Sequence, residues 1–256
     1  MKYSELVDPI IKIAREAGDA IMEIYNRGNI SVEIKKDNSP VTEADIAANE
    51  IIVKALAEIA PKIKIVSEEG KEIIEVSSGE VFFLVDPLDG TKSFINRTGE
   101  FTVNIAIVEN NHPVFGVVYL PVPKILYYTG ADGHAYKDEG EGDELISVRQ
   151  VPSEGHIVVA SKSHNNPETD EFIKKLNVSK FMPAASSLKF CLVAEGKADI
   201  YPRFGTTMEW DTAAAHAVLL AAGGHMIKTN GSPFTYGKPD FRNEYFIAYG
   251  NDLKLK

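Results

Sequence analysis

Apolar residues recur every three to four positions near the start of the chain. Over residues 4–26 they fall on one side of a helical projection, which predicts an amphipathic helix that we interpret as scaffold. A polar loop at 35–40 then separates a short predicted strand at 30–34 from a second predicted helix at 42–60. The chain therefore begins with two helices that flank a short extended segment.

Apolar runs after residue 60 predict strands. The runs cover 63–66, 81–85, 102–108, 114–120 and 125–129. Asn and Pro residues separate the last three runs, so we expect an antiparallel meander there. The Gly- and Glu-rich stretch 138–144 is expected to be a hydrophilic loop. We place a boundary after it, between an N-terminal α+β domain (1–148) and a C-terminal α/β domain (149–256).

Strands and helices alternate in the C-terminal part. Strands are predicted at 157–160, 199–201, 225–228 and 245–248, and helices at 168–176, 186–194 and 212–222. The last helix is almost wholly apolar and ends at a Gly pair. This alternation is typical of an α/β unit.

The run from Val81 to Thr91 changes from apolar to acidic within a few residues. The predicted strand delivers Asp86 and Asp89 to its end, and the following Gly90-Thr91 step can open a short helix with Asp89 as its N-cap. The amides of Gly90 and Thr91 would then face an anion. A strand, a proline turn and a helix cap explain the stretch without chemistry, but they do not require both carboxylates. The pair indicates a metal that bridges to phosphate.

Further acidic residues stand at similar places. Glu68 and Glu69 follow the strand at 63–66, and Asp45 lies three residues after Thr42 in a pattern typical of a capping box. Asp211 precedes the last helix and is either its N-cap or a ligand. A helix start can also aim a carboxylate into a cleft, so both interpretations of Asp45 stay open.

These carboxylates offer hard oxygen donors, and the six His residues show no paired helical spacing. Mg²⁺ or Mn²⁺ is therefore favoured over Zn²⁺. Two such ions roughly 3.5–4 Å apart would polarise a phosphoryl oxygen and activate water. The sequence has no Gly-rich phosphate loop with its Lys-Ser/Thr, which favours hydrolysis of a phosphate ester over kinase chemistry.

Composition limits the partners. The chain has 256 residues and a formal net charge of -10, from 37 acidic and 27 basic residues. Such a charge repels nucleic acid and offers little to an anionic membrane. The single cysteine, Cys191, excludes an internal disulfide, and the N-terminus shows no basic and apolar leader. We expect a cytoplasmic protein.

Three motifs together resemble the inositol monophosphatase-like superfamily of Mg²⁺-dependent, lithium-sensitive phosphatases: Glu68-Glu69, Asp86-Pro-Leu-Asp-Gly-Thr91 and Trp210-Asp211. The resemblance covers essentially the whole chain and implies a layered αβαβα sandwich of the sugar-phosphatase type. It implies two or three metal ions, bound by Glu68, Asp86, Asp89, Asp211 and the backbone carbonyl of Leu88. Thr91 and Asp45 would act beside Glu68 as catalytic residues, with Thr91 on the attacking water and Asp45 accepting from Thr91. Lys36 would approach when a further metal binds.

The stretches Ser186–Gly196 and Tyr201–Gly205 are similar to one branch of that superfamily, the 3′(2′),5′-bisphosphate nucleotidases of the CysQ type. Inositol phosphatases typically carry an acidic residue where Arg203 stands. The resemblance implies that Ser186, Lys189 and Arg203 hold a second phosphate of the substrate. His164 matches a position near the nucleoside, and Gly90, Thr91 and Asp211 also face the substrate.

The sequence thus predicts a hydrolase that converts adenosine 3′,5′-bisphosphate, and also its sulfated analogue, to the 5′-nucleotide and phosphate. An inositol monophosphatase or fructose-1,6-bisphosphatase is the alternative within the class. A nucleotide sensor without turnover is the alternative outside it, but pure binding has no use for the pair of Thr91 and Asp45. No nucleic acid polymer or membrane is expected as a partner, and a homodimer is common in similar proteins.

Overall fold

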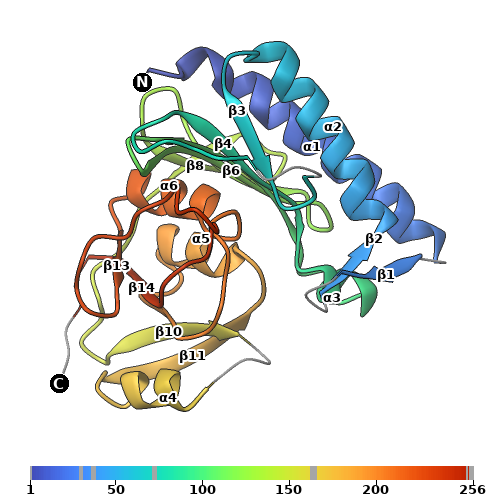
Figure 1. The fold of residues 1–256 in the computed structure, drawn as a ribbon. Coiled ribbons are helices and arrows are strands. Elements are labelled where there is room, and N and C mark those ends of the chain that lie inside the picture. Colours follow the sequence, from blue (N-terminus) through green and yellow to red (C-terminus); the bar gives the residue numbers. More distant parts are fainter. Residues whose placement is uncertain are drawn as a thin grey trace.

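The structure is a computed structural model that describes residues 2–28, 31–35, 39–70, 74–161, 166–251 and 253. Helices and sheets alternate as five layers in the order αβαβα, as the resemblance to the inositol monophosphatase-like superfamily implies (Figure 1). One sheet has seven strands and the other has five, and a separate two-stranded ribbon lies beside the first layer. None of the helices within these described ranges has the length and hydrophobicity to span a membrane.

The seven-stranded sheet follows the chain order. Its strands are β3 (Lys64–Ser67), β4 (Phe82–Asp89), β5 (Thr102–Glu109), β6 (His112–Leu120), β7 (Ile125–Thr129), β8 (Ala135–Asp138) and β9 (Asp143–Ile146). Only β3 and β4 pair in parallel; every later neighbour is antiparallel, which confirms the predicted meander. The prediction of a loop over 138–144 is wrong at both ends, because Asp138 belongs to β8 and Asp143 and Glu144 belong to β9, which pairs with β8. An exposed edge strand such as β9 carries polar residues and reads as a loop.

Two long helices cover the outer face of this sheet. They are α1 (Val7–Arg27), preceded by the turn η1 (Ser4–Leu6), and α2 (Glu43–Ile59). Gly18 lets α1 approach β6 closely, because a Cβ at this position would lie 2.4 Å from Cε1 of Tyr119. The ribbon of β1 (Val32–Ile34) and β2 (Pro40–Thr42) leads into α2, and the short α3 (Thr91–Ile95) follows β4.

The five-stranded sheet is built from the C-terminal part. In spatial order its strands are β11 (Val178–Ala184), β10 (His156–Ser161), β12 (Ile200–Arg203), β14 (Phe246–Tyr249) and β13 (His225–Lys228). The first three are parallel, and β14 is antiparallel to both of its neighbours. The pattern did not predict β11, an edge strand whose exposed side chains and Pro183 hide its periodicity.

Helices α5 (Leu188–Ala194) and α6 (Ala213–Ala221) fill the layer between the sheets, and α4 (Pro167–Ile173) contacts β12 of the second sheet. Gly116 of β6 admits α6 closely, since a Cβ there would lie 2.1 Å from the carbonyl oxygen of Ala214. One apolar core therefore joins residues of both halves. The sheets divide close to residue 148, while the assignment of two domains, 1–148 and 149–256, stays a prediction.

Candidate active site

The end of β4 is irregular, and this irregularity places two carboxylates. Asp86 pairs with Asn104 of β5 and Asp89 pairs with Thr102, so three steps on β4 match two on β5. Such a bulge bends the strand and redirects its side chains. The amide of Leu88 donates to Oδ1 of Asp86 at 3.1 Å, which stabilises the turn. Asp86 is buried and Asp89 reaches the surface of a pocket.

The expectation that Asp89 caps the next helix is wrong. Strand β4 continues through Asp89, and the N-cap of α3 is Gly90, whose φ of 99° lies in the left-handed region. A Cβ on Gly90 would lie 2.4 Å from Oγ of Ser186, so no larger residue fits. The carboxylate of Asp89 instead accepts from the amide of Ser187 at 2.7 Å.

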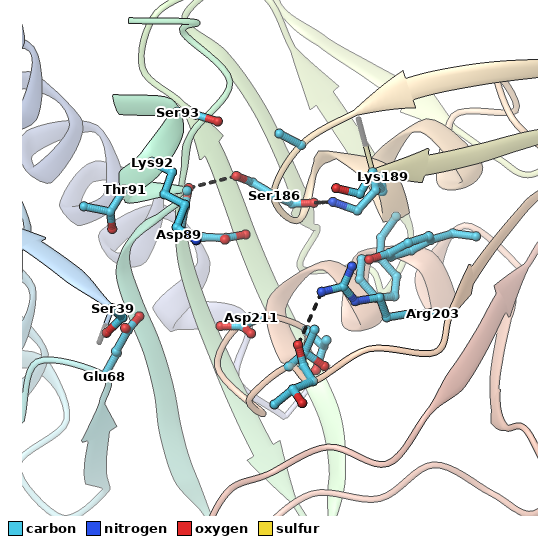
Figure 2. Close-up of a pocket in the computed structure, with 18 of the residues that line it drawn as sticks. Ser39, Glu68, Asp89, Thr91, Lys92, Ser93, Ser186, Lys189, Arg203 and Asp211 are labelled. Carbon is cyan, nitrogen blue, oxygen red and sulfur yellow. Dashed lines mark hydrogen bonds between the residues drawn. The ribbon is translucent and has the colours of Figure 1, made fainter. Parts of the chain in front are cut away.

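Carboxylates from three separate segments converge on one point. Glu68 follows β3, Asp86 lies on β4 and Asp211 lies in the turn before α6. Ligand oxygens of these three residues all lie within 4.8 Å of one another. Asp89 is not a member of this set, although it lines the same pocket as Glu68 and Asp211 (Figure 2). The hypothesis that distant acidic residues meet is therefore confirmed for three of the four.

The electrostatics of this cluster favour a cation. Burial raises the pKa of Asp86 and of Asp211 well above the ordinary value, and the neighbouring carboxylates raise both further. Burial also raises the pKa of Asp89 to about 6, against the opposing charge of Lys189. Crowded, desolvated carboxylates repel one another unless a cation neutralises them. An all-oxygen donor set suits a hard divalent cation, so these residues fit such an ion.

A lysine of the protein, Lys35, contacts one of the clustered carboxylates, Glu68. Nζ of Lys35 is 2.9 Å from Oε1 of Glu68 and also contacts Glu69. Burial acts to lower the pKa of Lys35, but the charges of Glu68 and Glu69 overcome it and raise the pKa. No local pattern in the sequence marks Lys35, because its contacts depend on the fold of the β1–β2 ribbon. Its predicted neighbour, Lys36, lies outside the described residues.

Asp45 completes the capping box and is buried rather than aimed into the pocket, but it contacts Thr91, which lines the pocket. Its Oδ2 accepts from the amide of Thr42 at 2.8 Å and from the hydroxyl of Thr42 at 2.6 Å, which completes a capping box at the start of α2. Its Oδ1 accepts from Oγ1 of Thr91 at 3.1 Å. Burial raises the pKa of Asp45, while the hydrogen bonds from Thr42 and Thr91 oppose that change.

Asp211 is not the helix N-cap, because Thr212 occupies that position. Oδ2 of Asp211 accepts from the amide of Met208 at 2.8 Å, within the turn that carries it. This bond fixes one oxygen of the carboxylate. The turn therefore presents Asp211 to the pocket, and the cap alternative for Asp211 is wrong.

A pocket of about 440 Å³ opens beside the acidic cluster. It is lined by Ser39, Pro40, Glu68, Asp89, Gly90, Thr91, Lys92, Ser93, Ser161, Ala185, Ser186, Lys189, Phe190, Tyr201, Arg203, Thr206, Thr207, Asp211 and Thr212. Figure 2 shows Glu68, Asp89 and Asp211 on one side, with Lys92 beside Asp89, and Lys189 and Arg203 on the other. The pocket thus combines an acidic side, suited to cations, with a basic side, suited to an anion.

Contacts with neighbouring residues fix the two side chains on the basic side of the pocket, Lys189 and Arg203. Nζ of Lys189 donates to the carbonyl of Ser186 at 2.7 Å and lies 5.2 Å from the centre of the Tyr201 ring. Burial lowers the pKa of Lys189 to about 8, although Asp89 opposes this change. Nη2 of Arg203 donates to the carbonyl of Thr206 at 3.3 Å, and its buried Nε has no hydrogen-bond partner within the described part of the chain.

Comparison with known proteins agrees with this arrangement. A model of the "Inositol monophosphatase family" matches residues 2–245. The chain belongs to the inositol monophosphatase family. A relative from Shigella flexneri, named 3′(2′),5′-bisphosphate nucleotidase CysQ, is 48% identical over 233 residues, which are 90% of this chain and 94% of the relative.

Solved structures of the inositol monophosphatase family share the fold. A crystal structure of CysQ from Bacteroides thetaiotaomicron, described as a bacterial member of the family, is 42% identical with a TM-score of 0.85 and covers 98% of this chain and 99% of that one. The Thermotoga maritima IMPase is 26% identical with a TM-score of 0.77, over 94% and 91% of the two chains. The fold and the phosphatase class expected from the sequence are confirmed.

The pocket does not include every expected residue. Asp45, Asp86 and Leu88 are buried beneath its surface, each 1–2% exposed. His164 lies outside the described residues. Ser186 lines the pocket, but its hydroxyl donates to the carbonyl of Asp89 at 2.9 Å, and Ser187, not Ser186, is the N-cap of α5. In this member of the inositol monophosphatase family, Ser186 therefore ties the start of α5 to the end of β4.

Proposed function

We propose that this protein hydrolyses adenosine 3′,5′-bisphosphate, and its sulfated analogue, to the 5′-nucleotide and inorganic phosphate. The observation that carries the proposal is the division of one pocket into an acidic side and a basic side. A substrate with two phosphates can use both. The relatives named 3′(2′),5′-bisphosphate nucleotidase support the same substrate.

The acidic side would hold Mg²⁺, with Mn²⁺ as a substitute. Its ligands would be Glu68, Asp86, Asp89, Asp211 and the carbonyl of Leu88. Bound there, the metal supplies a Lewis acid for the phosphoryl group and lowers the pKa of water. The burial of Asp86 keeps that carboxylate oriented whether or not the substrate is present.

Thr91 and Asp45 would manage the proton of the attacking water. The hydroxyl of Thr91 accepts a hydrogen bond from the water while it donates to Oδ1 of Asp45. Asp45 cannot rotate away, because its other oxygen is fixed by Thr42. The raised pKa of Asp45 makes it a better base than an exposed aspartate.

Lys189 and Arg203 would bind the second phosphate. Lys189 uses one donor on the carbonyl of Ser186 and keeps two for a ligand. Arg203 keeps several guanidinium donors, which can form a paired contact with phosphate. Ser186 supports this site by tying the start of α5 to the end of β4, and Gly90 leaves the space that the Ser186 hydroxyl occupies.

A comparison of substrates tests the proposal. Phosphate release would be measured from adenosine 3′,5′-bisphosphate, inositol 1-phosphate and fructose 1,6-bisphosphate, each with Mg²⁺ and with a chelator. We expect the nucleotide to have the highest kcat/KM and the chelator to abolish turnover. The variant Asp86→Asn should lose activity on every substrate. A preference for inositol 1-phosphate would favour the alternative within the class, and tight nucleotide binding without turnover would favour a sensor.

Two further features belong to the proposal. The free thiol of Cys191 is fully buried, which suits a core residue and a reducing compartment, and we propose a cytoplasmic location. We also propose a homodimer, which sedimentation would distinguish from a monomer.

A further inference from the structure

Glu209 fastens the turn that carries Asp211 to a distant segment of the chain. Its side chain is 0% exposed. Oε2 accepts from the amide of Gly237 at 2.7 Å, and Oε1 accepts from the amide of Lys238 at 3.1 Å and forms an ion pair with its Nζ at 2.7 Å. One carboxylate therefore uses both oxygens on a segment that follows almost thirty residues later.

Asn243 fastens the same turn at a second point. Its Nδ2 lies 2.6 Å from the carbonyl of Met208, and 3.1 Å from the hydroxyl oxygens of Thr207 and Thr212. The side chain is 6% exposed. The turn formed by residues 207–212, called the Asp211 turn below, is thus held from outside by two buried polar side chains, Glu209 and Asn243.

The carboxylate of Asp211 depends on the shape of this turn. Its Oδ2 accepts from the amide of Met208, the residue whose carbonyl Asn243 holds. Any movement of Met208 or of the neighbouring Glu209 would therefore move Asp211. Glu209 itself is fully buried and cannot touch a substrate in the pocket.

Stability alone is a weak reason for a buried charge at this position. Desolvation offsets much of the attraction in a buried ion pair, and apolar residues of similar volume often serve equally well. A carboxylate with three donors in defined directions instead specifies one geometry. This argues for a role in orientation.

We propose that Glu209, together with Asn243, is a positioning residue that sets the Asp211 carboxylate for metal binding. This inference rests on the proposed function, in which Asp211 is a metal ligand. Residues that orient metal ligands typically change metal affinity by about 10- to 100-fold when they are replaced.

The variant Glu209→Gln tests the proposal. It keeps the shape of the side chain but puts an NH₂ group against one of three donors, so one contact with Gly237 or Lys238 is lost. Binding of Mn²⁺ would be measured by electron paramagnetic resonance, without substrate. We expect the dissociation constant to rise about 10- to 100-fold.

Glu195→Gln is the matched control. Glu195 is also a buried carboxylate, 5% exposed at its side chain; it accepts from the hydroxyl of Tyr127 at 2.9 Å and forms ion pairs with Lys137 at 3.1 Å and with Lys197 at 3.0 Å. It lies away from the Asp211 turn, at the end of α5. Both variants should lose stability in urea, but only Glu209→Gln should lose Mn²⁺ affinity. Unchanged affinity in Glu209→Gln, or an equal loss in both variants, would overturn the proposal.

Two more variants keep the outcome decisive. If Glu209→Gln does not fold, Asn243→Ala releases the same turn and is judged by the same criterion. Asp211→Asn separates this inference from the proposed function. If Asp211→Asn binds Mn²⁺ as tightly as the wild type, the proposed ligand set is wrong; if only Asp211→Asn loses affinity, the positioning role is wrong.

Discussion

Thr91 and Asp45, which lie 46 residues apart in the chain, are joined by a hydrogen bond of 3.1 Å from Oγ1 of Thr91 to Oδ1 of Asp45. The second oxygen of Asp45 belongs to the capping box of α2. The first turn of a scaffold helix thereby becomes part of the site. Because each oxygen of Asp45 has its own partner, replacement of Thr91 should change turnover and replacement of Thr42 should change stability.

Replacement of Thr91 tests whether its hydrogen bond with Asp45 contributes to turnover. Thr91→Val keeps the shape but removes the hydroxyl, so we expect kcat to fall by about 10²- to 10⁴-fold with little change in the urea midpoint. Thr91→Ser keeps the hydroxyl and should retain most of the activity. If Thr91→Val retained full kcat in a steady-state phosphate assay, Thr91 would have no part in activating water.

Replacement of Thr42 tests whether the capping box of α2 contributes to stability. Thr42→Ala removes the hydroxyl of the cap and should lower the free energy of unfolding by about 0.5–2 kcal/mol. Asp45 still accepts from the amide of residue 42 and from Thr91, so kcat should fall less than tenfold. A larger loss of kcat would mean that the hydroxyl of Thr42 also orients the base.

The layered fold is implied by the resemblance to the inositol monophosphatase-like superfamily, while several local features near the pocket could be predicted from neighbouring residues. The cap at Thr42 and the apolar α6 follow from neighbouring residues, and both appear in the structure. The strand before Asp86 also appears, but it continues through Asp89. Two of the acidic residues with an alternative role as helix cap resolve differently: Asp45 keeps that role and Asp211 does not. Sequence alone cannot separate these cases, because both patterns place a carboxylate close to the start of a predicted helix.

Other features depend on contacts between distant segments. Lys35 meets Glu68 only because the fold brings the end of β1 to the end of β3, and the amide of Ser187 meets Asp89 only because the start of α5 lies at the end of β4. Glu209 shows no local pattern at all, since its partners follow at 237–238. Edge strands such as β11 are hard to predict for a related reason, because half of their surface is exposed.

Reversal of charge at Arg203 tests the choice of substrate. Arg203→Glu should reduce kcat/KM for adenosine 3′,5′-bisphosphate by at least about 100-fold, since it replaces a charge-assisted contact with repulsion. Turnover of inositol 1-phosphate, which lacks a second phosphate, should change much less. The control Arg27→Glu makes the same change of net charge at an exposed position of α1 and should change turnover of neither substrate. Equal losses on both substrates would contradict the assignment to the nucleotidase branch.

The pH dependence of kcat/KM for the bisphosphate should follow the charge of Lys189. Burial lowers the pKa of this lysine to about 8, so its charge is present below that pH and is lost above it. We expect kcat/KM for the bisphosphate to fall as pH rises from 7.5 to 9.5, with no matching fall for inositol 1-phosphate. In Lys189→Arg the cation persists, because guanidinium does not titrate in this range, and the alkaline fall should disappear. A fall that persists in Lys189→Arg would have another origin.

The loss of stability in acid should depend on protonation of His216. This residue is buried in α6, with its Nδ1 3.0 Å from the hydroxyl of Tyr236. Burial lowers the pKa of His216 to about 3, below its value of about 6.5 in an unfolded chain. The neutral ring therefore contributes stability that is present above pH 6.5 and is lost as pH falls towards 3. Between pH 6.5 and 4.5 this loss amounts to about 2 kcal/mol.

The variant His216→Asn isolates that contribution, because the amide can keep a polar contact with Tyr236 but does not titrate. Urea unfolding with a chelator, at pH 6.5 and at pH 4.5, would give the change in unfolding free energy for each protein. Carboxylates titrate alike in both, so the difference between the two changes belongs to His216. We expect the wild type to lose about 2 kcal/mol more than the variant. Equal losses would mean that His216 is protonated inside the fold or that acid opens the helix around it before the chain unfolds.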